Sequence, residues 1–456
     1  MPETPHPFGP QFVASERHDP PSSSAERVLL INPPVYDTRL HWAKWQQPAS
    51  LLRLATYLRH NGTTVKLLDA MHHRSDERLH RERVAFLDLD GLAVPKWRFG
   101  LSRSSIVAQL RELAKSGWYP DEVYVEGFTT FWWEGAAEVI ASVKAMFPRV
   151  QVVLLGGYAN LTPDHAAQHT AADRIRTGPL SELSCLPPDL SVYERAPTFT
   201  YILLADGRRT AEEIVDEVET MVAKHKVHHL AFAEHAVARR CPKLYRSILE
   251  KLAGRGRRVN LYALGNVSPA DLIEQPDLPG LMRRAGYVQI FFSDDRDSPM
   301  DPSTDDELIG TYRRASLLCH EAGFPQRTEA LTGGLCLGRP GEDVGRRARV
   351  ATFVAHHAGS VIFWPYQPLP NECPQLSLEE QNGKLFPLRG RNGLTYRDYL
   401  EVLGLGVVLN AKYRQRTFDF LGDGLISRLF QDSVARRGWD PDPEVKGSLR
   451  LPLVAR

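Results

Sequence analysis

Apolar runs and amphipathic stretches alternate along the first part of the chain. The run from Arg27 to Asn32, which two prolines end, is continuously apolar in its middle, as is typical of a strand buried on both faces. Residues 48–60 place their leucines on one side of a helix, which Asn61-Gly62 ends. Further strands are predicted at residues 64–69, 122–127, 150–155 and 174–176, with a helix over residues 133–146. This alternation predicts a parallel, doubly wound sheet, whose ligands bind at the carboxyl ends of the strands.

The same alternation continues from residue 198 onward. Six more strands are predicted at residues 198–204, 229–233, 259–264, 288–292, 329–337 and 361–365. Helices are predicted over residues 243–253, 278–285, 306–322 and 343–357. Another helix follows Thr210, because Thr210 and Glu213 have the spacing of a capping box. Six successive (βα) units predict an open partial barrel.

Two segments lie outside these patterns. Residues 1–26 are rich in Pro, Ser and His without an apolar signal core, so we interpret them as a disordered leader. Residues 399–430 are predicted to be largely helical, although Gly404 and Gly406 each weaken a helix by about 1 kcal/mol relative to alanine. The predicted organisation is a leader at 1–26, an α/β domain at 27–190, a partial barrel at 191–375 and a helical extension at 376–456.

Composition and charge narrow the functional classes. Of the 456 residues, 43% are hydrophobic and 24% are charged, and the formal net charge is +1. These values are typical of a globular protein and give no attraction to nucleic acid or to an anionic membrane surface. No apolar run approaches the roughly 18 residues that cross a bilayer. We therefore expect a cytoplasmic protein with no nucleic-acid or membrane partner.

The cysteines are far apart in the sequence. The five are Cys185, Cys241, Cys319, Cys336 and Cys373. Their odd number and wide spacing argue against a disulfide framework and against a zinc ribbon. We expect buried free thiols and name no metal ligand.

Distinctive residues follow the predicted strands of the first domain. Asn32-Pro33-Pro34 follows the first strand, Asp69 ends the second, and Gly156-Gly157 follows the fourth. Paired glycines allow a backbone to approach a bulky ligand closely. They also occur in tight turns that bind nothing, and for Gly156-Gly157 alone the two interpretations carry equal weight.

Together these segments resemble the cobalamin-binding domain that precedes the barrel in many radical S-adenosylmethionine enzymes. The similarity is carried by LLINPP, by PASLLRLATYLRHNGTTVKLLD and by VLLGGY. It implies a Rossmann-like domain that binds cobalamin through Asp69, Thr129, Thr130, Gly156, Gly157 and Gly178. It also implies that no histidine ligates cobalt, since the loop after the first strand lacks the D-x-H-x-x-G pattern of the other cobalamin-binding family.

The second domain resembles the radical S-adenosylmethionine barrel, and the combined resemblance covers residues 27 to 375. The stretch GGLCLGRPGED is similar to the fifth strand of that barrel, with a generic strand–turn–helix as the alternative. By this resemblance Gly338, Glu342 and Ser293 would contact S-adenosylmethionine, if that ligand is still bound.

The loop that carries the iron–sulfur cluster in that family is different here. The family has C-x-x-x-C-x-x-C after the first barrel strand, whereas this chain has ADGRR at residues 205–209, directly before the capped helix. Iron–sulfur clusters depend mostly on cysteine thiolates. We therefore expect no iron–sulfur cluster and no reductive cleavage of S-adenosylmethionine by the usual route.

Candidate catalytic residues are few. Glu234 and His235 follow the second barrel strand, where they could bind a metal or act as an acid–base pair, although a surface or structural role is favoured. Asp294 and Asp295 follow the fourth strand, where a solvated turn is the alternative. The sequence has no nucleophile elbow, P-loop or H-E-x-x-H motif.

Three functional hypotheses follow from the resemblance. The first is a cobalamin-binding protein that assists a cluster-bearing radical S-adenosylmethionine homologue in methylation or specialised metabolism. The second is a cluster-independent, cobalamin-dependent methyltransferase that acts on a small-molecule substrate. The third is a structural protein whose cobalamin site has decayed. Fold alone does not decide among them.

Overall fold

The computed structural model describes the chain in segments. These are residues 25–37, 47–72, 79–89, 91–178, 183–195, 197–255, 259–292, 304–326, 328, 330–337, 343–365, 395, 397–398, 401–402, 404–406 and 409–410. The chain divides into two compact units. Unit 1 comprises residues 1–86, 95–234 and 367–387, and unit 2 comprises residues 87–94, 235–366 and 388–456.

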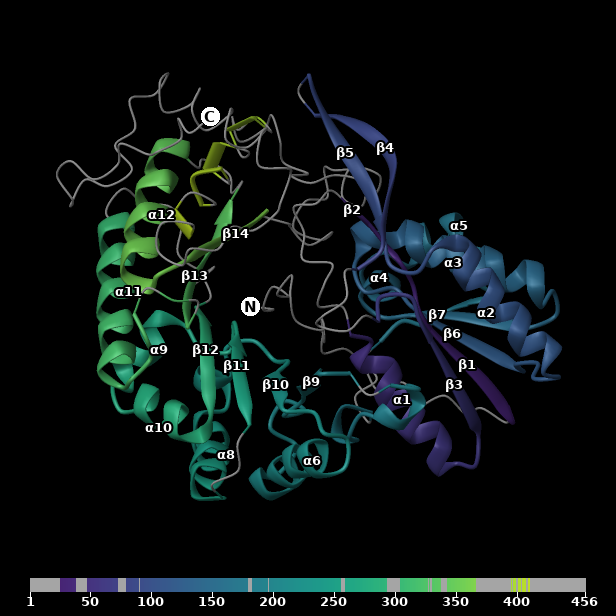
Figure 1. The fold of residues 1–456 in the computed structure, drawn as a ribbon, viewed down its shortest axis with the longest axis horizontal. Helices are drawn as coiled ribbons and strands as arrows, with labels where there is room; N and C mark the ends of the chain where they lie inside the picture. The colour runs from purple at the N-terminus through teal and green to yellow at the C-terminus, as the bar shows by residue number, and fades with distance from the viewer. Residues whose placement is uncertain are drawn as a thin grey trace. The chain divides into compact units, whose positions relative to one another are not determined.

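A five-stranded parallel sheet forms the centre of unit 1 (Figure 1). In spatial order its strands are β3 (Thr64–Asp69), β1 (Arg27–Asn32), β6 (Glu122–Glu126), β7 (Gln151–Leu155) and β8 (Arg174–Ile175). Every neighbouring pair is parallel. The predicted parallel α/β sheet is therefore confirmed, and its strand order is that of a doubly wound fold.

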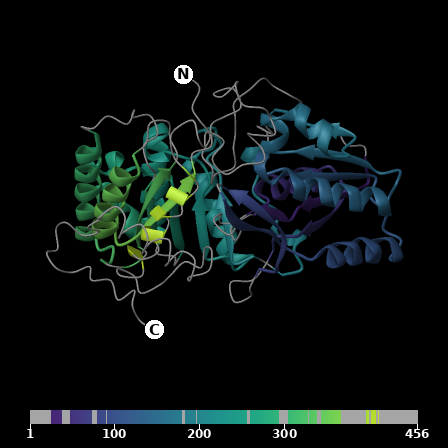
Figure 2. The same ribbon diagram turned by 90° about the horizontal axis from the view of Figure 1, so that it is seen from above.

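Helices cover both faces of this sheet (Figures 1 and 2). One face packs against α1 (Ala49–His60). The other packs against α2 (Arg103–Lys115), α3 (Trp133–Met146), α4 (Gly157–Leu161) and α5 (Pro163–His169). In β1, Leu30 points to the α1 face and Ile31 to the opposite face, because side chains alternate along a strand. Both faces are buried, which explains the continuous apolar run in the sequence.

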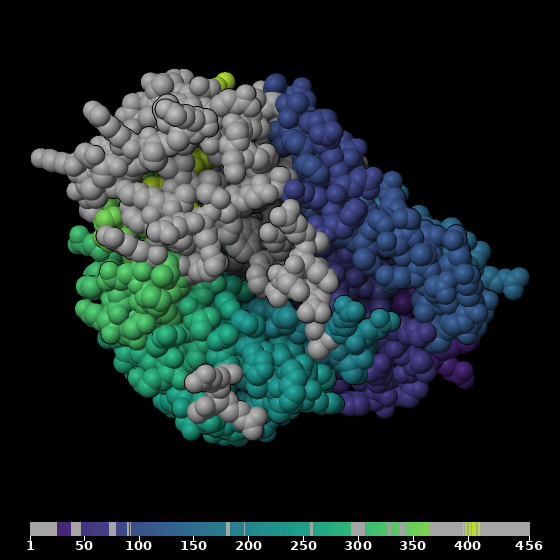
Figure 3. Space-filling view, in the orientation of Figure 1, coloured from purple at the N-terminus to yellow at the C-terminus, as the bar shows by residue number. Residues whose placement is uncertain are grey.

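Residues between β3 and β6, for which the sequence indicated no role, form a hairpin and a helix. Strands β4 (Arg81–Leu89) and β5 (Leu92–Phe99) join β2 (Val35–Asp37) in a three-stranded sheet of order β2-β5-β4. The sequence signal that predicts such a hairpin is Asp90-Gly91, a common two-residue turn. The hairpin is exposed on the face that Figure 3 shows, and Phe86 is 56% exposed. On its inner side Arg98 is buried and forms an ion pair with Glu138 of α3 at 2.6 Å.

Unit 1 continues past residue 190 into a βαβ segment. Strands β9 (Phe199–Ile202) and β10 (His229–Phe232) are parallel, and α6 (Ala211–Ala223) connects them. The predicted capping box at the start of α6 is confirmed: the Glu213 N–H donates to Thr210 Oγ1 at 3.2 Å, and the Thr210 N–H donates to Glu213 Oε2 at 2.7 Å. The resemblance places a domain boundary at residues 190 and 191, whereas the compact unit extends to Glu234.

Within residues 235–366 of unit 2, the described strands are also parallel to one another. They are β11 (Asn260–Leu264), β12 (Tyr287–Phe292), β13 (Leu331–Leu337) and β14 (Val361–Pro365). The main helices are α8 (Pro242–Arg255), α10 (Leu278–Ala285), α11 (Thr304–Glu321) and α12 (Val344–Ala358). The short α7 (Val237–Arg240) and α9 (Pro269–Glu274) were not predicted. With β9 and β10, all six strands expected after residue 198 form.

The described part of the C-terminal extension packs on unit 2. The side chain of Asn410 bonds both backbone groups of Val361 in β14, donating to its oxygen and accepting from its nitrogen at 2.8 Å each. The helix predicted over residues 399–430 is described only as far as residue 410, and the described residues of that stretch are helical.

The thiols differ in exposure. Cys319 and Cys336 are buried, Cys241 is half-buried and Cys185 is exposed, while Cys373 lies outside the described residues. Burial raises the pKa of the Cys319 thiol to about 12. In the segments that the structure describes, no helix combines the length and the apolarity needed to cross a membrane.

Candidate functional site

Three polar side chains form a row across the carboxyl end of the unit 1 sheet. Asn32 of β1 is in register with Asp69 of β3, and the pairing of Ile31 with Val125 places Glu126 of β6 on the other side of Asn32. All three share the α1 face, since they lie two residues beyond Leu30, Leu67 and Tyr124 of that core. We call these three residues the polar row. It spans β1 and β6, where the strand order reverses and doubly wound folds bind their ligands.

The carboxylate of Asp69 already accepts hydrogen bonds from three groups of the protein. Its Oδ1 accepts hydrogen bonds from Asn32 Nδ2 at 2.7 Å and from the Met71 N–H at 2.9 Å, and its Oδ2 accepts one from the Tyr193 hydroxyl at 2.7 Å. Burial raises the pKa of Asp69, and the Tyr193 and Asn32 hydrogen bonds act against that rise. Burial and the Asp69 charge together raise the pKa of Tyr193 well above its usual value. Asp69 therefore joins β3, β1 and the loop that carries Tyr193.

Glu126 is the member of the polar row that the sequence did not single out. It is 5% exposed, and its carboxyl faces Ser50 and Leu51 at the start of α1. Burial, with a smaller contribution from Asp69, raises the pKa of Glu126 to about 7. A signal was available in the sequence, because a glutamate that ends a buried strand is an unusual residue at that place.

The glycines after β6 and β7 are explained by contact between two loops. The Gly127 N–H donates to the Leu155 oxygen at 2.7 Å, and the Tyr158 N–H donates to the Gly127 oxygen at 2.9 Å. A Cβ atom at Gly156 would lie 2.7 Å from the Gly127 oxygen, and Gly156 has a φ of +98°. Glycine at position 156 is thus required by the turn itself.

The other glycines predicted to contact cobalamin lie at the same edge of the sheet. Gly157 is buried at the start of α4, directly after Gly156. Gly178 follows β8, and its N–H donates to Asn160 Oδ1 at 2.8 Å. Their contact with a cofactor stays a prediction.

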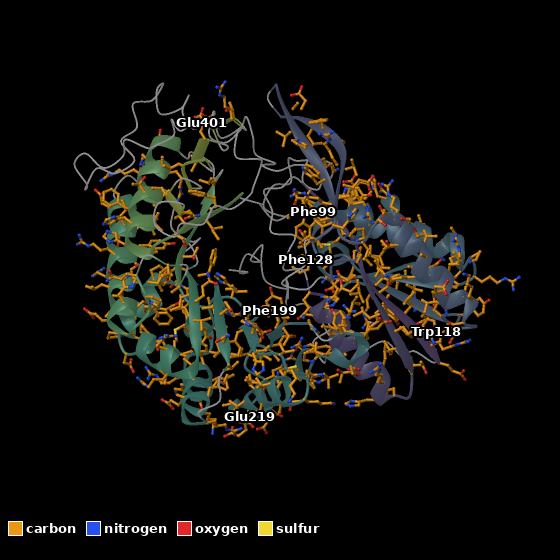
Figure 4. The ribbon with its side chains drawn as sticks, viewed as in Figure 1. Phe99, Trp118, Phe128, Phe199, Glu219 and Glu401 are labelled. Atoms are coloured by element: carbon orange, nitrogen blue, oxygen red, sulfur yellow. The ribbon has the colours of Figure 1, made fainter. Side chains whose placement is uncertain are left out.

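Thr129 and Thr130 lie in an aromatic environment after β6. Thr129 is buried, and Thr130 is half-buried at the start of the 3-10 turn η2 (Thr130–Trp132). Trp132 packs in a cluster with Val35, Met71 and Phe99, and the half-buried residues Leu79, Trp97, Phe128 and Phe131 pack against that cluster. Phe99 and Phe128 lie close together in Figure 4. The candidate edge thus has half-buried aromatic rings beside its polar row.

Glu234 closes the loop that follows β9. Its Oε1 accepts hydrogen bonds from the Leu204 N–H at 2.6 Å and from the Ala205 N–H at 2.8 Å. Ala205 and Asp206 have φ values of +55° and +53°, in the left-handed region that few residues other than glycine adopt. Burial raises the pKa of Glu234 to about 7, although these hydrogen bonds and the charge of Arg53 act against the rise. The carboxylate therefore has a structural role in holding an unusual loop.

Of the remaining candidates, the structure describes only His235, which directly follows Glu234. His235 is half-buried and begins the segment 235–366 of unit 2. Ser293, Asp294, Asp295, Gly338 and Glu342 lie outside the described residues. Among the residues that are described, no group of three or more His, Cys, Asp and Glu side chains is arranged to hold a metal ion.

Comparisons with known proteins do not assign this chain to a family. The chain matches no protein-family model and no curated protein sequence. An adenine deaminase from Arthrobacter aurescens is similar over 89% of this chain and 100% of its own, with 12% identity and a TM-score of 0.24. A similarity this weak carries no argument about fold or function.

Proposed function

We propose that this chain is a cobalamin-binding protein that lacks an iron–sulfur cluster and assists a cluster-bearing radical S-adenosylmethionine homologue. The observation that carries the proposal is the parallel strand order β3-β1-β6-β7-β8, with Thr129, Gly156 and Gly178 at its carboxyl edge. Doubly wound sheets of this order bind flat cofactors at that edge. The resemblance in sequence selects cobalamin among such cofactors.

The residues at this edge suit a large, flat ligand. Phe128 and Phe131 offer half-buried rings for apolar contact, and Thr130 offers a half-buried hydroxyl. Gly157 and Gly178 would contact cobalamin through their backbone. Asp69 is left out of the proposed cobalamin contacts, because its carboxylate already accepts three hydrogen bonds from within the protein. Bound cobalamin would supply a cobalt centre that carries a methyl group, and these residues would bind and orient it.

The role of an assisting protein is supported by the loop after β9. In the proposed six-unit partial barrel this loop occupies the position of the cluster loop, yet it contains no cysteine and its N–H groups bind Glu234. The chain would then present cobalamin or substrate to a partner that holds the cluster and cleaves S-adenosylmethionine.

A spectroscopic titration tests the cobalamin proposal. Hydroxocobalamin added to the full chain should change its absorbance spectrum and saturate near one equivalent. Thr130→Trp, which places a bulky ring at the candidate edge, should weaken binding at least about tenfold, equivalent to 1.4 kcal/mol. Thr64→Trp is the matched control, because Thr64 is exposed at the opposite, amino end of β3. An unchanged spectrum, or equal weakening in both variants, would overturn the proposal.

Metal analysis and a binding assay test the assisting role. Protein from cobalamin-fed cells should contain cobalt and no iron, whereas about four irons per chain would indicate a complete cluster. The cobalamin-loaded chain should co-elute with a cluster-bearing homologue encoded in the same genome. Turnover by the purified chain alone would refute an assisting role.

Methyl transfer by the chain itself is a second candidate function. In this function Glu234 would act as a general acid or base in addition to holding the loop after β9, since burial raises its pKa to about 7. The chain alone would then demethylate methylcobalamin in the presence of an acceptor, and Glu234→Gln would abolish turnover without weakening cobalamin binding. Equal turnover in the variant and the wild type would exclude this role of Glu234.

A further inference from the structure

Glu126 is the member of the polar row with a buried oxygen that no donor reaches. Oε2 is buried and has no hydrogen-bond partner among the described residues. A buried, ionised oxygen without a donor is costly, whereas a protonated carboxyl is neutral.

Helix α1 begins beside this carboxyl. Its N-cap residue, Pro48, makes no side-chain cap, and its first turn contains no acidic residue. The first N–H groups of a helix require acceptors from outside the helix. Ser50 and Leu51 of this turn face the Glu126 carboxyl of β6.

The charges around Glu126 favour its neutral form. Asp69 of β3 lies on the same face, beyond Asn32, and holds three hydrogen bonds that stabilise its ionised form. His72, after β3, acts electrostatically on Asp69, and the Tyr193 hydroxyl contacts the same carboxylate. Burial and Asp69 raise the pKa of Glu126, while Ser50 and Leu51 of α1 lower it.

We propose that Glu126 is a proton-binding site that couples the N-terminus of α1 to pH at the edge of the sheet where the strand order reverses. At mildly acidic pH, Oε2 takes a proton from solvent and the carboxyl is neutral. When the proton leaves, two carboxylates stand on either side of Asn32, and an unpaired charged oxygen lies beneath the first turn of α1. That turn is then less stable, so the candidate ligand edge responds to pH. This proposal does not rest on cobalamin binding.

Infrared spectroscopy of the full chain tests the proposal directly. At about pH 6 the wild type should show a protonated-carboxyl band that weakens as the pH passes about 7. Glu126→Gln should remove the amplitude of one carboxyl from this band. Glu122→Gln is the matched control, because Glu122 lies at the other end of β6 and pairs with Arg174 at 3.0 Å. Glu234 contributes equally to the band in all three proteins. An equal band in wild type and Glu126→Gln would overturn the proposal.

A second variant keeps the test decisive if Glu126→Gln does not fold. Asp69→Asn retains Glu126 and removes the neighbouring negative charge. The midpoint at which the band disappears should then move to lower pH. An unchanged midpoint would show that the titrating carboxyl is not the one beside Asp69.

Discussion

The buried carboxyl of Glu234 should make the stability of this chain depend on pH. The pKa of Glu234 is raised by burial from 4.5 to about 7, so between these values the folded state binds more protons than the unfolded chain. Stability is therefore lost as the pH rises from about 5 to about 7. Glu234→Gln keeps an acceptor for Leu204 and Ala205 and removes this contribution, which is at most about 3 kcal/mol.

Urea unfolding at a series of pH values measures the effect. The stability of Glu234→Gln relative to the wild type should be higher at about pH 7.5 than at about pH 5. Glu212→Gln, an exposed position in the first turn of α6, should follow the wild type. If Glu234→Gln and the wild type lose stability in parallel, the burial of Glu234 does not control its titration.

Two helical glycines should respond to alanine in opposite directions. A Cβ atom at Gly135 of α3 would lie 1.7 Å from the Pro34 oxygen, a backbone atom that cannot move aside. Gly135→Ala should therefore destabilise the fold by about 2 kcal/mol or more. At Gly254 of α8 a Cβ atom would meet nothing within 4 Å. Gly254→Ala should stabilise by about 0.5 to 1 kcal/mol, because alanine is the better helix former. Thermal unfolding of both variants checks the signs, and two changes of the same sign would contradict the geometry.

At the scale of elements, the capping box of α6 is a local device with a measurable contribution. Thr210→Ala removes the acceptor of the Glu213 N–H and should cost about 1 kcal/mol. Thr220→Ala on the same helix is the control, since the Thr220 hydroxyl only bonds back to the Asp216 oxygen at 2.8 Å. Denaturant unfolding should show a change of less than about 0.5 kcal/mol for that control. Equal losses would mean that the capping box adds nothing specific.

The same elements show what the sequence can predict. The strands of the unit 1 sheet and helices such as α3 and α10 were predicted to within a residue, because their apolar periodicity is strong and local. The hairpin of β4 and β5 was missed. Its strands carry many charged residues, which hide the apolar pattern. Pro95 lies inside β5, and a proline is allowed there only near a sheet edge, so it weakens the prediction of a strand. Only Asp90-Gly91 indicated the turn.

The candidate site was likewise predictable from the sequence only in part. The carboxyl-end residues Asp69, Thr129 and Gly156 could be placed at one edge from the sequence, since parallel strands end at the same side. The hydrogen bonds to the Asp69 carboxylate and the burial of Glu126 could not be predicted from the sequence. Both depend on Tyr193 and on the start of α1, which lie far from these residues in the sequence and meet them only after folding.

At the scale of the whole chain, a buried ion triad ties the βαβ segment to the α/β sheet of unit 1. Glu217 of α6 contacts Arg209 at 2.7 Å and Arg53 of α1 at 3.6 Å, and all three side chains are at most 5% exposed. Arg53 also donates to the Tyr201 oxygen of β9 at 3.3 Å. This connection accounts for the extension of the compact unit beyond residue 190.

Removing the central carboxylate should therefore have a large and regional effect. Glu217→Gln removes the carboxylate that both buried guanidinium groups contact and should cost about 3 to 5 kcal/mol. Glu112→Gln, in an exposed pair with Lys115, should cost less than about 1 kcal/mol. Hydrogen exchange locates the effect: in the wild type the amides of β9, α6 and β10 should open together with those of β1 and β6. In Glu217→Gln the amides of the βαβ segment should open first, at lower free energy than the five-stranded sheet. If they already open separately in the wild type, the triad does not unite the two parts. If both parts weaken equally in the variant, its stabilising effect is spread over the unit and does not reside in the connection between α1 and α6.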